Sequence, residues 1–490
     1  MRPEDIYKAI GETDDELLLE AEKLSPEAEA EETKNTKEPV DITEKRKGRG
    51  WIARITAIAA CAALFIGGMF AYTFNKGNTP GGNGETAQIL VEAKVPAGDY
   101  TSDGAVPQLP DVHEGEDPDV TADPSKLTKK LSGKEGALLI MPDDGENHAY
   151  SPVNISLALA MLSETTDDET RQQIYGLLGV SSEEELRAYI AELFAQAYYD
   201  GENGKSLLAN SIWLRNDGTQ YNEDVLRVLA EYYCTSSFSG EMGSKEYDEM
   251  LRKWINEHTE NLLEQEAGEL GFDRSTIIAL ASTIYYHADW MEPFFEEATK
   301  QQVFHAPDGD RSVQMMYTGK TDYYYRGEHF GAVSLRLADG NNYWIFLPDE
   351  GYTVEDVLSD DAMMEIIRQE AEGEYADVTI GLPRYDISAS LDLKDVLKEM
   401  GVTDVFDGSK ADFTPLLGEE GSASVSHVQH AARVSVDEYG LTAAAFTVIT
   451  ADGAMMPPDK HVDLICDRPF VFAVANDSGL VFFEGVVNRP

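Results

Sequence analysis

The residue types that usually carry enzymatic chemistry occur in this sequence, but not at the spacings that enzymes need. The chain has no GxSxG, HExxH or GxxxxGK[ST] motif, the signatures of a nucleophilic serine, a catalytic zinc and a phosphate-binding loop. The fragment Gly204-Lys205-Ser206 lacks the upstream glycine of such a loop. Among nine histidines, only His427 and His430 have a ligand-like spacing, and no third ligand is near them in the sequence. We therefore expect no enzymatic activity, no cofactor and no metal site.

A stretch near the C-terminus is unusual in composition. Residues 438–450 are mostly small or β-branched, whereas residues 451–458 contain a glycine and two prolines. Small and β-branched residues, as in 438–450, can form a strand of a β-sheet. Glycine and proline, as in 451–458, are typical of an exposed loop. Taken alone, this pattern predicts an ordinary strand followed by a loop.

The overall composition excludes several classes of protein. The 490 residues include 90 Asp and Glu against 39 Lys and Arg, a formal net charge of −51, and 42% are hydrophobic. The apolar share is enough for a large core, and the charge argues against binding nucleic acids or anionic lipid. The three cysteines, Cys61, Cys234 and Cys466, exclude a disulfide scaffold. Unpaired thiols are favoured, with a single Cys234–Cys466 bridge as the alternative.

Three segments precede the main domain. Residues 1–50 are acidic and are expected in the cytoplasm. A basic cluster at 45–49 precedes the uncharged residues 55–72, which are near the minimum length that spans a bilayer. Because basic flanks stay in the cytoplasm, residues 51–72 are predicted to form a single-pass signal-anchor helix, with a cleaved signal peptide as the alternative. Residues 73–125, rich in Gly, Pro, Asp and Thr, are predicted to form a flexible extracellular stalk.

Residues 126–490 are predicted to form one large α+β domain. Helical periodicity covers 154–178, 182–199, 222–233, 245–266, 354–372 and 391–400. Runs rich in β-forming residues cover 276–286, 331–346, 376–388, 432–436, 462–465 and 470–487. The strands gather after runs of helices, which favours largely antiparallel sheets over a doubly wound fold.

Several short motifs of this domain, taken in their order, resemble those of the serpin family. The similar segments are 151–162 (SPVNISLALAML), 208–214 (LANSIWL), 283–294 (TIYYHADWMEPF), 382–385 (LPRY), 392–397 (DLKDVL), 411–413 (ADF), 467–472 (DRPFVF) and 485–490 (GVVNRP). His430 also stands eight residues before Glu438-Tyr439-Gly440, which is similar to the spacing of the family's hinge. The resemblance implies a large mixed central β-sheet, further sheets, about eight or nine helices and an exposed reactive-centre loop.

The resemblance also implies a function. A serpin presents its loop to a protease, and the cleaved loop inserts into the central sheet and carries the acylated protease with it. The matching hinge residues are Glu438, Gly440, Leu441, Thr442, Ala443, Ala444 and Ala445. Since side chains alternate along a strand, the residues expected to face the core are Leu441, Ala443, Ala445, Thr447 and Ile449, without a charge or a proline among them. Leu441 is bulkier than the residue usual at the first inserted position, which weakens the prediction of inhibition.

The resemblance places the reactive bond seventeen positions along, counting Glu438 as the first. This puts Ala454 before the cut and Met455 after it, with a shift of one residue left open. Small Ala454 suits the narrow pocket of an elastase-like or subtilisin-like serine protease, and a cysteine protease is the alternative target. A trypsin-like target is disfavoured because residues 440–458 contain no Arg or Lys. We expect the inhibitor to be a monomer.

Five further residues match the region of a serpin that opens for the loop: Ser151, Asn154, Ser282, Trp290 and His430. His430 is expected to bond polar partners below the sheet, and Ser282 replaces the asparagine that the family pattern predicts. The sequence as a whole is interpreted as a protease inhibitor tethered to the outside of a bacterial cell membrane. The alternatives are a serpin scaffold that binds at the cell surface without inhibiting, and a cell-surface enzyme or adhesin.

Overall fold

The computed structural model describes residues 87–93, 123–201, 204–268, 270–418, 423–441 and 460–490. Residues 1–50, predicted to be cytoplasmic, residues 51–72, predicted to be an anchor, and residues 442–459 of the predicted loop therefore lie outside the described residues. Within the described ranges, every helix is too short or too polar to cross a membrane.

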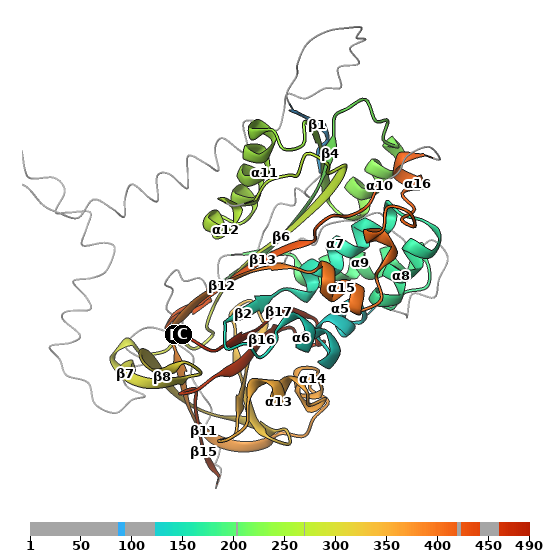
Figure 1. Cartoon of the computed structure of the whole chain (residues 1–490). Coiled ribbons are helices and arrows are strands. Elements are labelled where there is room, and N and C mark those ends of the chain that lie inside the picture. Colours follow the sequence, from blue (N-terminus) through green and yellow to red (C-terminus); the bar gives the residue numbers. More distant parts are fainter. Residues whose placement is uncertain (1–86, 94–122, 202–203, 269, 419–422, 442–459) are drawn as a thin grey trace, which may run out of the picture. The chain divides into compact units, whose positions relative to one another are not determined.

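The described residues form two sheets, the first of which has eight strands, in the order β1-β5-β4-β6-β14-β13-β12, with β3 paired to β4 (Figure 1). Its strands are β1 (Ala87–Val91), β3 (Tyr199–Gly201), β4 (Gly204–Arg215), β5 (Thr235–Gly240), β6 (Ile278–Asp289), β12 (Tyr385–Asp392), β13 (Gln429–Val436) and β14 (Gly440–Leu441). The pair β4–β5 is parallel and the pair β4–β6 is antiparallel, so the sheet is mixed, as expected.

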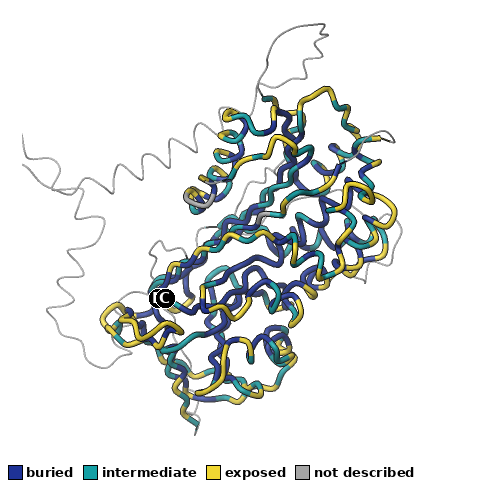
Figure 2. Tube along the Cα trace, viewed as in Figure 1, coloured by how far each residue is buried: buried dark blue, intermediate teal, exposed yellow. Residues whose placement is uncertain are grey.

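The second sheet follows the order β15-β11-β8-β9-β10-β16-β17-β2, with β7 paired to β8. Its strands are β2 (His148–Tyr150), β7 (Lys300–Ala306), β8 (Gly309–Arg326), β9 (Phe330–Arg336), β10 (Asn342–Pro348), β11 (Glu374–Pro383), β15 (His461–Ile465), β16 (Phe470–Ala475) and β17 (Val481–Val487). Figure 2 shows buried positions along β16 and β17, whereas exposed positions gather on β7 and on the adjoining part of β8.

The described residues contain more α-helices than the eight or nine expected. They are α5 (Ser125–Ser132), α6 (Lys134–Ile140), α7 (Pro152–Glu164), α8 (Asp168–Leu178), α9 (Glu183–Ala197), α10 (Glu223–Tyr232), α11 (Lys245–His258), α12 (Glu264–Gly268), α13 (Val354–Leu358), α14 (Ala362–Ile367), α15 (Lys394–Glu399) and α16 (Thr414–Leu417). The helices α12 to α16 have only four to six residues, which is too short for a periodic pattern to reveal each one.

The helix predicted over 154–178 is in fact two helices, α7 and α8. Two threonines end α7: the hydroxyl of Thr165 donates to the carbonyl of Leu162, and that of Thr166 donates to the carbonyl of Ser163. Side chains that bond the backbone in this way compete with helical hydrogen bonds. The separate α7 is buried on nearly every face and packs directly against β6.

Strand β1 comes from the segment for which the sequence predicts a flexible stalk. It pairs antiparallel with β5, placing Ala87 opposite Gly240 and Ile89 opposite Phe238. Residues 87–91 are therefore an edge strand of the folded sheet rather than part of a flexible stalk.

Candidate functional site: the seam between β6 and β13

Strands β6 and β13 are neighbours in the first sheet only through the two-residue strand β14. Leu441 lies opposite Ala288 of β6 on one side and Val436 of β13 on the other. Within the described ranges, no ladder joins β6 directly to β13 beyond this point. A sheet that is open along an internal seam is a template for an additional strand.

The hinge residues Gly440 and Leu441 already occupy the top of this seam. A Cβ atom at Gly440 would lie 2.3 Å from the carbonyl oxygen of Ala288, so only glycine allows this close approach. Leu441 is 2% exposed, which means that the core accommodates the bulk that the sequence analysis treats as an obstacle. Oδ1 of Asp437 accepts hydrogen bonds from the backbone nitrogens of Tyr439 and Gly440 and so fixes the turn from β13 into β14.

The side chain of Glu438 holds the hinge in place through two hydrogen bonds. Its carboxylate is 1% exposed, and Oε1 accepts hydrogen bonds from Arg384 and from the hydroxyl of Thr299, each at 2.5 Å. Burial raises the pKa of Glu438, but the bonds from Arg384 and Thr299 outweigh burial and leave that pKa below its usual value. The buried carboxylate is therefore held ionised by its two donors.

Trp290 covers the point where the hinge leaves the sheet. Its ring nitrogen donates to the carbonyl of Asp437, and its backbone nitrogen donates to the carbonyl of Tyr439, both at 2.8 Å. The indole ring packs edge-on against Tyr343, with 5.3 Å between ring centroids. The structure thus brings Trp290, Glu438 and Gly440 into one cluster.

His287 belongs to the same cluster, although the sequence analysis does not single it out. Its Nδ1 donates to the carbonyl oxygen of Leu441 at 2.8 Å, and its Nε2 lies 3.6 Å from Oδ1 of Asp289. Burial raises the pKa of Asp289, His287 lowers it, and Asp437 raises it again, with a net upward shift. The sequence signal that could have identified His287 is its position within the motif 283–294, three residues before Trp290.

The four residues expected below the opening sheet are also brought together. The backbone nitrogen of Ser151 donates to Nε2 of His430 at 3.0 Å, and Nδ2 of Asn154 donates to the carbonyl of Ser282 at 3.0 Å. His430 therefore uses Nε2 as an acceptor, and burial lowers its pKa to about 4. The Ser282 hydroxyl and Oδ1 of Asn154 have no hydrogen-bond partner among the described residues.

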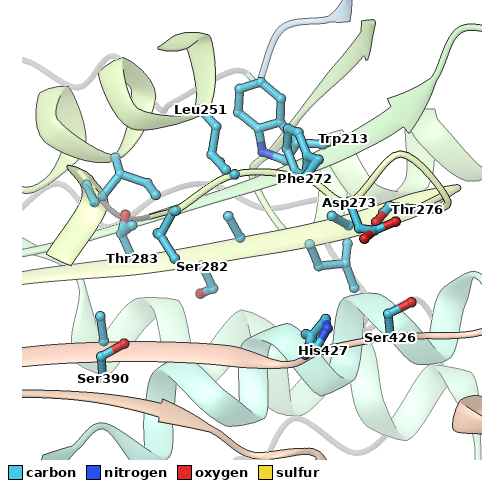
Figure 3. A pocket seen from close by; sticks show the side chains of 18 of the residues that line it. Trp213, Leu251, Phe272, Asp273, Thr276, Ser282, Thr283, Ser390, Ser426 and His427 are labelled. Atoms are coloured by element: carbon cyan, nitrogen blue, oxygen red, sulfur yellow. The ribbon is translucent and has the colours of Figure 1, made fainter. Parts of the chain in front are cut away.

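Two hollows open at the lower part of the seam, one on each side of the sheet. The hollow toward α11 and α12 has a volume of about 160 Å³, and the hollow toward α7 has a volume of about 70 Å³. Figure 3 shows the larger one, with Ser282 and Thr283 on one side and Ser426 and His427 on the other. Asn154, Ser282 and His430 line the smaller one.

A buried carboxyl group outside the seam was also missed. Glu484 of β17 is 0% exposed, and its Oε2 lies 3.0 Å from the hydroxyl oxygen of Tyr150. That hydroxyl has one hydrogen and also lies 2.9 Å from the carbonyl oxygen of Leu131. The Tyr150 hydroxyl can donate to only one of these two oxygens at a time, and Oε1 of Glu484 has no hydrogen-bond partner among the described residues. Burial raises the pKa of Glu484 to about 8, while the contact with Tyr150 lowers it.

Six of the predicted site residues fall within residues 442–459. Ala454 and Met455 of the reactive bond and the hinge residues Thr442, Ala443, Ala444 and Ala445 lie outside the described residues. Cys234 and Cys466 are both buried and free, so they form no bridge with each other. In the described part of the chain, no group of three or more His, Cys, Asp and Glu side chains is arranged to hold a metal ion.

The chain is similar to known proteins over most of its length. The chain is 26% identical over 386 residues to plasminogen activator inhibitor 1 of Sus scrofa, covering 75% of this chain and 92% of that protein. It is 27% identical over 376 residues to neuroserpin of Mus musculus, covering 71% of this chain and 87% of that protein.

Among solved structures, the chain resembles the thermophilic serpin tengpin in its native state. The TM-score is 0.66 at 24% identity, over 74% of this chain and 94% of tengpin. The sequence model described as "Serpin (serine protease inhibitor)" matches residues 133–490. The chain therefore belongs to the serpin family.

Proposed function

We propose that the protein is a suicide-substrate inhibitor of elastase-like or subtilisin-like serine proteases. Cleavage between Ala454 and Met455 would free the loop, which then inserts between β6 and β13 and traps the acylated protease. The observation that carries this proposal is the position of Leu441, paired on both sides at the top of an open seam. The start of the inserted strand is thus present before any cleavage.

The two pairings of Leu441 specify where each later residue of the loop would lie. One step along the loop corresponds to one step back along both β6 and β13, because both pairings are antiparallel. Six steps beyond Leu441, Thr447 falls opposite Ser282 and His430. This position borders the smaller hollow, where the Ser282 hydroxyl and Oδ1 of Asn154 have no partner among the described residues. Thr447 would supply a hydroxyl that can both donate and accept.

The next inward residue meets the apolar end of the same hollow. Ile449 falls opposite Leu280 of β6, and Ile155 and Leu159 of α7 line the hollow there. Polar and apolar ends of the hollow thus face loop residues of matching character. Ten residues of β6, 278–287, remain available to an inserted strand, and at roughly 0.5–1.5 kcal/mol per ladder bond the gain is on the order of 10 kcal/mol before apolar burial is added.

The cellular setting is a further part of this proposal. The basic cluster at 45–49 and the uncharged residues 55–72 support an anchor with the serpin domain outside a bacterial cell. Protease treatment of intact cells should then release a fragment of about the size of the C-terminal domain. Protection of the domain until the cells are lysed would show the opposite orientation.

Incubation with pancreatic elastase and with subtilisin tests the inhibitory function. We expect a complex that survives denaturing electrophoresis, together with a small C-terminal fragment whose sequence begins at Met455. Cleavage without a complex would instead favour the alternative function, a serpin scaffold that binds at the cell surface without inhibiting.

A further inference from the structure

The larger hollow at the seam is lined by different kinds of side chain on its helix side and on its sheet side. On the helix side it is lined by the apolar residues Leu251 and Ile255 of α11 and Leu263, which precedes α12. On the sheet side the lining residues that face the helices are small: Ala281 and Thr283 of β6, and Ala431 of β13. The hollow is therefore a space between a bulky apolar cover and the small side chains that β6 and β13 present beside the seam, with Trp213 of β4 also in its lining.

We propose that this hollow is the receptor for the aromatic ring of Phe446 when the loop inserts. Phe446 is five steps beyond Leu441, which places it opposite Thr283 and Ala431. Leu441 and Ala288 belong to the core cluster that contains α7, whereas Ala281 and Ala431 pack against the cluster of α11 and α12. Even-numbered loop residues would therefore face α11 and α12. The inference rests on the proposed insertion but goes beyond it, because it assigns the outward face of the new strand a binding site of its own.

The size of the hollow fits a single aromatic ring. Its volume is about 160 Å³, and an apolar cavity of about 150 Å³ in another protein is known to accept benzene. Trp213 lies at the same site, and its ring is already stacked on Phe238 with 4.2 Å between centroids. An incoming phenyl ring would therefore extend an existing cluster of aromatic side chains.

At the preceding loop residue on the same face, Ala444, a small side chain would meet large side chains of the sheet. Ala444, three steps beyond Leu441, falls opposite Tyr285 and Arg433. Both side chains are large, and Arg433 donates to the carbonyl of Leu262 at 3.1 Å, so this space is filled. The loop thus carries a small residue where the sheet surface is bulky and a large one where it is hollow.

The test uses the full chain, cut within residues 442–459 by catalytic amounts of papain and compared with the uncut protein by thermal unfolding. The parent should gain considerable thermal stability on cleavage. Phe446→Ala should gain less, by roughly 3–6 °C, because the hollow stays empty. The double variant Ala444→Phe, Phe446→Ala carries the same side chains in exchanged positions and should not recover the loss.

A reciprocal variant separates the receptor from general effects on the loop. Ala267 of α12 lines the hollow, and Ala267→Leu should fill part of it. This change should reduce the stability gain of the parent but not that of Phe446→Ala, because only the parent places a ring there. Equal gains for the parent and Phe446→Ala would overturn the receptor while leaving insertion intact. No gain in either protein would contradict insertion itself and the receptor with it.

Discussion

The carbonyl oxygen of Leu441 accepts a hydrogen bond from Nδ1 of His287 at 2.8 Å. Leu441 is the last described residue before residues 442–459, so a side chain of β6 holds the point from which the proposed insertion would start. The burial of Leu441 and the close fit of Gly440 act at the same place. The hinge is thus fastened by three independent features.

Removal of the imidazole should loosen this hinge. His287→Ala loses one hydrogen bond, worth about 1 kcal/mol, so the amides of Gly440 and Leu441 should exchange with solvent about fivefold faster. His287→Asn keeps a donor near the position of Nδ1 and should exchange like the parent. Hydrogen exchange of peptides that span residues 437–441 measures the effect. An unchanged rate in His287→Ala would show that this hydrogen bond does not hold the hinge.

His430 should make the protein less stable in acid. Its pKa is about 4 in the folded protein against 6.5 as its ordinary value, so between these values the unfolded chain binds a proton that the folded one does not. The contribution is complete above pH 6.5 and is lost as pH falls toward 4, by about 1.4 kcal/mol per pH unit. His430→Gln should flatten this part of the stability profile, measured by urea unfolding between pH 7 and pH 4.5.

His427→Gln is the matched control for that measurement. His427 is exposed and pairs with Asp392 at the surface, so its replacement should leave the slope close to that of the parent. If His430→Gln and the parent lost stability in parallel, His430 would not be the group that takes up the proton.

Glu484 should have the opposite effect. Its pKa rises from 4.5 to about 8 on folding, so between these values the folded protein keeps a proton that the unfolded chain has released. The contribution of Glu484 to the free energy of unfolding is therefore most favourable below pH 4.5 and falls by about 1.4 kcal/mol per pH unit as pH rises toward 8. Glu484→Gln should remove this loss between pH 5 and pH 8, whereas Glu399→Gln, at an exposed position, should not.

The ion pair of Arg384 with Glu438 should matter more than a surface pair. Arg384→Ala leaves the buried carboxylate with Thr299 as its remaining side-chain donor, and we expect a loss of about 1–3 kcal/mol in the free energy of unfolding. Arg326→Ala breaks the exposed pair with Asp349 and should cost less than about 1 kcal/mol. Equal losses for the two variants would mean that burial of Glu438 adds nothing to the pair.

The features that could be predicted from the sequence are those that depend on short motifs and on their order along the chain. The successive motifs around Ser151, Trp290 and His430 indicate the fold, because each occupies a fixed place in the chain relative to the hinge. Strand β1 could not be predicted in this way, because its partner β5 lies about 150 residues away and its neighbours in sequence are polar or glycine-rich. The 18-residue strand β8 pairs with β11 along residues 315–324 and with β9 at residues 325–326. Because its neighbours change along its length, its sequence shows no simple alternation of apolar and polar residues.

Parts of the site depend on distances that a sequence does not contain. The pairing of Leu441 on both sides and its bond with His287 require knowledge of how far β6 and β13 are separated. The burial of Glu484 could not be predicted from the sequence, because glutamate is almost always exposed. It follows from the position of β17 between β16 and β2 in the second sheet.

Strand insertion as the trapping step is tested most directly by Ala443→Pro. In the inserted strand Ala443 would lie opposite Tyr286 and Val434, and proline there removes a ladder donor without touching the proposed reactive bond at Ala454. The measurement is the ratio of covalent complex to cleaved product on a denaturing gel after incubation with pancreatic elastase. We predict that the variant is cut at the rate of the parent but forms little complex, whereas the parent forms mostly complex. Equal trapping by Ala443→Pro and the parent would contradict strand insertion as the mechanism.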